Sequence, residues 1–283
     1  MLKNIEIHSI KTDLPYSIIS KKYNSAQNDS IVFICSATGV LQGYYSKFAS
    51  FLSEHGFTVY TFDYGGIGLS KKQSLKNFDT TLTNWATNDI ENVIKYIKSL
   101  HPNKKINCLC HSIGGQLIGL VPSNKIIHNL VLVTSQNINH RFWKGFSKIQ
   151  TFLNYHLLIP TVTYLYGYLP SKRIMKMENL PKSMAFEFAK WGRSKNHVFS
   201  LKGKKSLFHH QITGNITSYS TENDNFAPKE AVDWMAKKYE NGNNVRKHLI
   251  AKNYNVKSIG HFGFFKSKFK DSIWLEFLSD LQQ

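Results

Sequence analysis

The chain has 283 residues, 42% of them hydrophobic and 13% aromatic, which excludes a disordered chain and allows one large core. Its formal net charge of +18 comes from 36 Lys and Arg against 18 Asp and Glu, mostly as scattered doublets such as Lys71-Lys72. Scattered doublets are typical of a solvated surface; contact with an anionic membrane is the alternative, and no nucleic-acid partner is expected because no nucleic-acid-binding motif accompanies the charge.

The first half of the chain alternates strand and helix patterns. Short apolar, β-branched runs predict strands buried on both faces, and apolar residues at helical spacing predict the helices between them. In chain order these are a strand at 31–36, a helix at 44–55, a strand at 58–63, a helix at 84–100, a strand at 105–110, a short helix at 113–120 and a strand at 129–134. This alternation predicts an α/β fold with a mostly parallel central sheet flanked by helices.

The alternation stops after residue 136. The following stretch is rich in aromatic residues, Lys and Pro, and it has helical pieces but no convincing strand. The strand and helix patterns then resume, with a strand at 212–221, a helix at 227–240, a strand at 245–252 and a terminal helix at 267–281. We therefore predict a core formed by residues 1–136 and 207–283, interrupted by an inserted helical cap at 137–206; an independent second domain is the alternative.

The cysteines and the absence of targeting patterns bear on the compartment. Cys35, Cys108 and Cys110 form no disulfide framework, which fits a reducing environment. The N-terminal sequence MLKNIEIHSI lacks the apolar core of a secretory signal. No run reaches the ~18 apolar residues of a membrane-spanning helix, and the nearest, 151–170, is broken by Pro160 and other residues. We expect a cytoplasmic protein.

The sequence KINCLCHSIGGQ carries the most informative motif. A predicted strand ends, Ser112 follows, and Gly114 and Gly115 open a helix, which is the pattern of a nucleophile elbow. Such a turn lifts the serine hydroxyl above the sheet, and small neighbours let strand and helix approach closely. Cys110 stands where the motif has its first glycine, and its register inside the strand end argues against a nucleophilic role. His111 is expected to pack and form hydrogen bonds beneath the turn.

A serine nucleophile needs a base. After such an elbow the partners follow in the order acid, then histidine, with the acid after a late strand and the histidine before the last helix. Asp224 follows the strand at 212–221, and His261 lies in KSIGHFGFF before the terminal helix. We predict Ser112 as nucleophile, His261 as general base and Asp224 as the acid that orients it; Glu222 is the alternative acid.

An oxyanion hole needs two backbone N–H groups near the nucleophile. The loop CSATGVLQG and the residue after the serine predict the N–H groups of Thr38 and Ile113, with Ala37 as the alternative to Thr38. The turn FDYGGIGLS lacks the Gly-Lys-Ser/Thr of a phosphate-binding loop, and no G-x-G-x-x-G opens a helix after the first strand. His209-His210 alone does not have zinc-ligand spacing. We expect no cofactor and no metal.

Together these motifs resemble those of a known family. The chain is similar to bacterial predicted α/β-hydrolases of the serine aminopeptidase-like or lysophospholipase-like type, over nearly its whole length, through ATGV, FDYGGIGLS, NWATNDI, CHSIGGQ, WGRS, DNFAP and IGHFGFF. The resemblance implies the α/β-hydrolase fold and a catalytic triad at Ser112, Asp224 and His261. Two positions depart from the family pattern: Cys110 replaces the elbow glycine, and Gly65 stands where relatives commonly carry arginine.

These residues predict a serine hydrolase that cleaves carboxylic esters through an acyl-enzyme, with acyl lipids and thioesters as candidate substrates. Aromatic residues of the predicted cap, namely Phe142, Trp143, Tyr164 and Trp191, are expected to line an apolar substrate pocket. Two other functions stay open: an acyltransferase with the same triad, and a non-catalytic binding protein with a basic, membrane-facing surface. The sequence predicts no oligomeric state.

Overall fold

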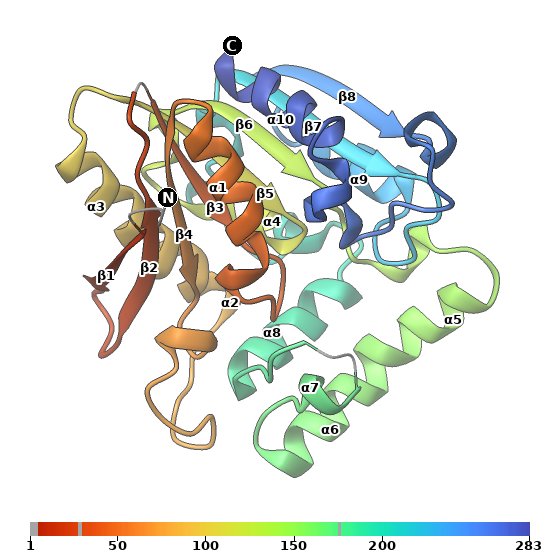
Figure 1. Ribbon diagram of the computed structural model, residues 1–283. Helices are drawn as coiled ribbons and strands as arrows, with labels where there is room; N and C mark the ends of the chain where they lie inside the picture. The colour runs from red at the N-terminus through yellow and green to blue at the C-terminus, as the bar shows by residue number, and fades with distance from the viewer. Residues whose placement is uncertain (1–4, 28–29, 175–176) are drawn as a thin grey trace.

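A computed structural model describes residues 5–27, 30–174 and 177–283. Their central feature is a twisted eight-stranded sheet in the order β1-β2-β4-β3-β5-β6-β7-β8 (Figure 1). The pairings β1/β2 and β2/β4 are antiparallel and the others are parallel. The strands are β1 (Ile5–Lys11), β2 (Ser17–Tyr23), β3 (Ser30–Cys35), β4 (Phe57–Asp63), β5 (Lys105–His111), β6 (Ile127–Val133), β7 (Asn215–Thr221) and β8 (Asn243–Leu249).

Helices cover both faces of the sheet, as expected for buried parallel strands. Apolar residues of α1 and α10 form one core with one face, while α3 and α4 pack into a second core on the other. The α-helices are α1 (Ser46–Glu54), α2 (Leu82–Asn84), α3 (Glu91–Leu100), α4 (Ile113–Leu117), α5 (Gly145–Leu153), α6 (Ile159–Tyr166), α7 (Ser171–Ile174), α8 (Lys182–Arg193), α9 (Lys229–Ala236) and α10 (Ile273–Gln282).

The structure confirms the predicted alternation and corrects it in three places. Strands β1 and β2 were not predicted, because they form an antiparallel hairpin whose outer strand is mostly exposed and lacks an apolar run. The helix predicted at 84–100 contains a π-helical segment, Trp85–Ile90, between α2 and α3. The terminal helix begins at Ile273 rather than residue 267 because a short 3₁₀ turn precedes it.

The chain between β6 and β7 adds no strand to the sheet within its described residues. It forms α5 to α8, which Figure 1 places beneath the sheet in green and teal. A π-helical segment, Asn154–Leu158, joins α5 to α6 without a break, so one helix extends from Gly145 to Tyr166. Among the described residues, no helix is both long and apolar enough to cross a membrane.

Gly65, one of the two departures from the family pattern, borders a buried polar cluster. A Cβ added there would lie 2.5 Å from the ring of Tyr16, whose hydroxyl donates to Asp89 Oδ1 at 2.7 Å. The fully buried Asp89 carboxylate also accepts from the Gly65 N–H and from Asn88 Nδ2, each at 2.8 Å. Burial raises the pKa of Asp89 to about 6. Tyr16 therefore fills the space that a larger side chain at position 65 would need.

Candidate active site

Ser112 lies on the sharp turn between β5 and α4. Its backbone has φ 52° and ψ −114°, a strained combination for a residue with a side chain, and strain of this kind clusters at functional sites. The turn is held by its N–H, which donates to the Val133 carbonyl at 2.8 Å, and by its carbonyl, which accepts from the Gly115 N–H at 3.1 Å. The predicted strand, turn and helix therefore occur at this serine.

The two glycines after the turn are required by close packing. A Cβ added at Gly114 would lie 2.6 Å from the Cys35 carbonyl oxygen, and one at Gly115 would lie 2.1 Å from Ser135 Oγ. Real Cβ atoms do not approach so closely, so a larger residue at either position would push α4 away from the sheet. The spacing of strand and helix that sets the serine in place thus depends on both glycines.

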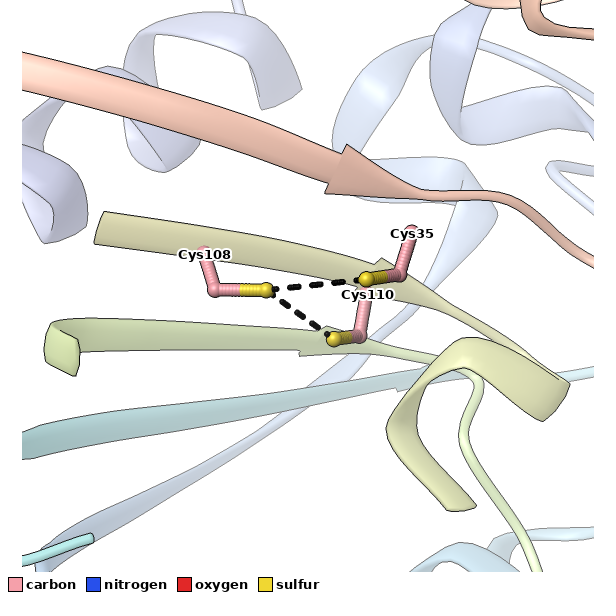
Figure 2. Close-up of side chains that lie close together, drawn as sticks. All are labelled: Cys35, Cys108 and Cys110. Carbon is pink, nitrogen blue, oxygen red and sulfur yellow. Dashed lines mark hydrogen bonds between the residues drawn. The ribbon is translucent and has the colours of Figure 1, made fainter. Parts of the chain in front are cut away.

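Cys110 occupies the usual glycine position of the elbow without distorting it. Figure 2 shows its sulfur gathered with those of Cys35 and Cys108 over one face of the sheet, where β3 pairs with β5. The Cys108 sulfur lies 3.3 Å from that of Cys110 and 4.0 Å from that of Cys35, and all three cysteines are fully buried free thiols. Burial raises the pKa of Cys108 and Cys110 well above the usual thiol value, which disfavours a thiolate nucleophile.

This thiol cluster is the only group of three or more metal-capable side chains found among the described residues. The spacing of Cys35 along the chain did not reveal it, because only the pairing of β3 with β5 brings that residue beside the other two. The cluster lies within the apolar core. A metal bound by three thiolates would leave net negative charge there, so we interpret the cluster as core packing.

His261 and Asp224 are in direct contact. His261 Nδ1 lies 2.9 Å from Asp224 Oδ2, and the two side chains are 5% and 0% exposed. The other carboxylate oxygen accepts the N–H groups of Phe226 and Ala227 at 2.8 and 3.0 Å, which fixes its orientation. The alternative acid, Glu222, instead accepts the Ala251 N–H at 2.9 Å. With Nδ1 donating to the carboxylate, Nε2 is free to accept a proton.

Ser112 and His261 line the same cavity, which has a volume of about 380 Å³. The hydrogen bonds among the described residues include none between Ser112 Oγ and His261 Nε2; such contacts often tighten only when substrate is bound. Thr38 and Ile113, the predicted oxyanion residues, line this cavity as well. As the first residue of α4, Ile113 has an N–H without a partner inside the helix. The alternative, Ala37, donates its N–H to Tyr45 Oη at 3.0 Å and is therefore engaged elsewhere.

His111 connects three parts of the site beneath the elbow. The Ala37 N–H donates to Tyr45 Oη, and that hydroxyl lies 2.8 Å from His111 Nδ1. On its other side, His111 Nε2 lies 3.0 Å from the carbonyl oxygen of His261. A carbonyl only accepts, so Nε2 carries the proton and Nδ1 accepts from tyrosine. Burial, together with nearby His261, lowers the pKa of His111 well below its usual value, so the ring is neutral.

Of the four aromatic residues predicted to line the pocket, one lies on the cavity wall and three do not. Trp143 lines the cavity, and its indole N–H donates to the Asn225 carbonyl at 2.8 Å. Tyr164 is 75% exposed, Trp191 is buried in the core against His197, and Phe142 packs near Trp234; none of these three is among the cavity-lining residues. That part of the prediction is corrected, because aromatic content does not show which way a helix face points.

Sequence reasoning missed several residues of the cavity wall. Phe226 and Phe262 are neighbours of the acid and the histidine in sequence, so adjacency to the predicted triad was the available signal. The apolar wall contributed by the segment between β6 and β7 carried no comparable signal; it includes Ile138, Tyr155, Ile159, Leu169, Leu180 and Phe188.

The sheet order, the turn at Ser112 and the acid and histidine after β7 and β8 are those of an α/β-hydrolase fold. Residues 26–136 match the family model described as serine aminopeptidase, S33. This match and the fold confirm the resemblance predicted from the sequence. No curated protein matches the chain.

Solved structures share the fold at low sequence identity. A soluble variant of monoglyceride lipase from Saccharomyces cerevisiae is 12% identical with a TM-score of 0.70, covering 100% of this chain and 95% of that one. A carboxyl esterase from Bacillus coagulans is 13% identical, with a TM-score of 0.67 and 98% of each chain covered. The Pyrococcus furiosus esterase Pf2001 is 15% identical, with a TM-score of 0.62 and coverage of 99% and 92%. At this identity the likeness establishes the fold.

Proposed function

We propose that this protein is a cytoplasmic, cofactor-independent serine hydrolase that cleaves carboxylic esters. The observation that carries the proposal is the pairing of His261 with a buried carboxylate, on the wall of the same cavity as a serine held in a strained turn. The S33 family match and the esterase and lipase neighbours agree with this chemistry.

In the proposed reaction, Ser112 Oγ attacks the ester carbonyl carbon while His261 Nε2 takes the hydroxyl proton. Asp224 accepts the hydrogen bond from Nδ1 and stabilises the imidazolium. The histidine then gives its proton to the leaving alcohol, which breaks the ester C–O bond and leaves an acyl-enzyme. Water, deprotonated by the same histidine, attacks the acyl carbon and releases the carboxylic acid and free Ser112.

The N–H groups of Thr38 and Ile113 are proposed to hold the oxyanion that forms at each attack. Both residues border the cavity beside the serine, and the first turn of α4 adds the positive end of its peptide dipoles. The Ala37 N–H donates to the Tyr45 hydroxyl, which favours Thr38 over Ala37 as the donor from this loop.

The cavity favours an acyl group as the part of the substrate that is bound. Its volume lies within the range of small-molecule sites, and its wall combines polar groups near Ser112 with apolar side chains such as Ile159, Leu180 and Phe188. Several of these come from the segment between β6 and β7. We therefore propose that residues 137–206 act as a cap that forms the acyl pocket, with an acyl lipid or a thioester as substrate.

The test is labelling with a fluorophosphonate probe, read by intact mass. Wild type is expected to gain one adduct, Ser112→Ala none, and the control Ser147→Ala one, since Ser147 lines the same cavity but lies on α5. Turnover of p-nitrophenyl esters should be lost with the label. Unlabelled, folded wild-type protein would contradict the proposal. Products formed with an added alcohol acceptor distinguish hydrolysis from acyl transfer.

A further inference from the structure

The helix formed by α5 and α6 exposes an apolar stripe. Phe146, Ile149 and Leu153 follow one another at spacings of three and four residues, which places them on one side of α5, and Leu157 and Tyr164 continue the exposed apolar surface along the helix. Their exposed fractions are 78%, 57%, 47%, 61% and 75%. Monomeric proteins rarely leave so many large apolar side chains together in water, so this outer stripe is suited to contact with an apolar partner.

Another side of the same helix borders the cavity with polar side chains on α5 and with the buried Tyr155 and Ile159 further along. Ser147, Gln150, Thr151 and Asn154 line the cavity that contains Ser112. A surface helix ordinarily turns its apolar side inward and its polar side to solvent. Here α5 has no buried residue and its large apolar side chains are exposed, which indicates that water is not the only medium the outer stripe meets.

The surroundings of the stripe are strongly basic. Residues 137–206 contain 13 Lys and Arg against 2 Asp and Glu, so this segment carries most of the net charge of the chain. The stretch from Asn137 to Met177 contains no acidic residue at all. Lys148 on α5 is next to Ile149 in the sequence, Arg173 is on α7, the helix that follows α6, and both are exposed. An apolar stripe with a basic border matches a bilayer surface with acidic head groups.

We propose that the outer side of α5 and α6 docks on an anionic lipid surface, with the apolar stripe among the acyl chains and the basic residues at the head groups. The charge argues against a second copy as the occupant, because a twofold interface would place two strongly basic segments against each other. The helix lies on the membrane rather than across it, since no described helix can span one.

Docking in this orientation has a consequence for the site. The stripe and the cavity wall belong to one helix, whose diameter with side chains is about 10 Å. The cavity would therefore lie about one helix diameter from the lipid surface. The docking itself does not depend on catalysis and is tested by binding alone.

The experiment is sedimentation of the full-length protein with vesicles of phosphatidylcholine containing phosphatidylglycerol, or of phosphatidylcholine alone. Wild type is expected to bind the anionic vesicles, more weakly at high salt. Ile149→Gln/Leu157→Gln should weaken binding at least about tenfold, because it removes two side chains from the lipid. The control Val245→Gln/Leu275→Gln removes two apolar side chains that are 45% and 44% exposed on β8 and α10, at the opposite end in Figure 1, and should bind as wild type does.

A second pair of double variants tests whether the basic residues on α5 and α7 contribute to vesicle binding. Lys148→Gln/Arg173→Gln should weaken binding to anionic vesicles by about tenfold and flatten its salt dependence, while Lys71→Gln/Lys72→Gln should not. Circular dichroism verifies that each variant is folded. The proposal is overturned if wild type does not bind, if both apolar pairs bind equally, or if wild type is a dimer that Ile149→Gln/Leu157→Gln converts to a monomer while vesicle binding is unchanged. Repeating the assay with Ser112→Ala should give wild-type binding, which separates docking from hydrolysis.

Discussion

Replacing His111 by phenylalanine tests whether the hydrogen bonds beneath the elbow position His261, the proposed general base. Phenylalanine keeps an aromatic ring among the neighbouring rings of Phe262 and Phe265 but removes both ring nitrogens. The Tyr45 hydroxyl loses its acceptor and the His261 carbonyl loses its donor. Tyr45 still accepts the Ala37 N–H, so the carbonyl of His261 is the group left fully unpaired.

The expected cost follows from these two lost contacts. An unpaired buried polar group costs about 1–3 kcal/mol, so His111→Phe should lower the free energy of unfolding by about 2–4 kcal/mol. The matched control is His209→Phe. His209 is equally buried between the rings of Phe199 and Tyr239, but neither of its ring nitrogens has a hydrogen-bond partner among the described residues. Its replacement should be neutral or stabilising.

Urea unfolding measures the loss of stability, and ester turnover measures the effect on the proposed catalytic step. Because His111 holds the backbone of His261, kcat should fall about ten- to a hundredfold in His111→Phe, with a smaller change in KM. The control should keep wild-type turnover. If His111→Phe is as stable and as active as His209→Phe, the hydrogen bonds beneath the elbow do not position His261.

Three further predictions follow from single contacts. Asp224→Asn should fold normally but lose about 10⁴-fold in kcat for ester hydrolysis, because an amide no longer favours the tautomer with Nδ1–H; activity near wild type would rule out Asp224 as the acid. Burial lowers the pKa of His209 to about 3, below its unfolded value near 6.5, so its contribution to stability is complete above pH 6.5 and lost as the pH falls toward 3. Denaturation at pH 6.5 and 5 should therefore show wild type losing up to about 2 kcal/mol more than His209→Phe, and equal losses would contradict the assignment. Gly65→Arg should destabilise the chain because Tyr16 occupies its space, and Tyr16→Ala should restore part of that loss, whereas additive effects in thermal melts would argue against a shared space.

The sequence was sufficient for the parallel part of the sheet and for the elements that carry the proposed triad residues. Strands buried on both faces have apolar runs that stand out, as in β3 and β4, and short turns fix where each run ends. The hairpin of β1 and β2 was not predicted because an exposed edge strand needs no such apolar run. Asp224 and His261 were found from the elements they follow, and their contact in space could not be read from the intervening residues.

The proposed cap, residues 137–206, shows most clearly why the remainder of the site could not be predicted. Composition indicated an aromatic pocket, and one of the four named residues, Trp143, does line the cavity. Tyr164 lies on the same helix as cavity-lining residues yet faces solvent. Both sides of that helix carry large or functional side chains, so the sequence pattern did not show which side faces the cavity. When one side meets a substrate cavity and the other meets a membrane, hydrophobic periodicity no longer marks the inside. If the proposed docking is correct, the misplacement of Tyr164 is itself a sign of a second apolar medium outside the protein.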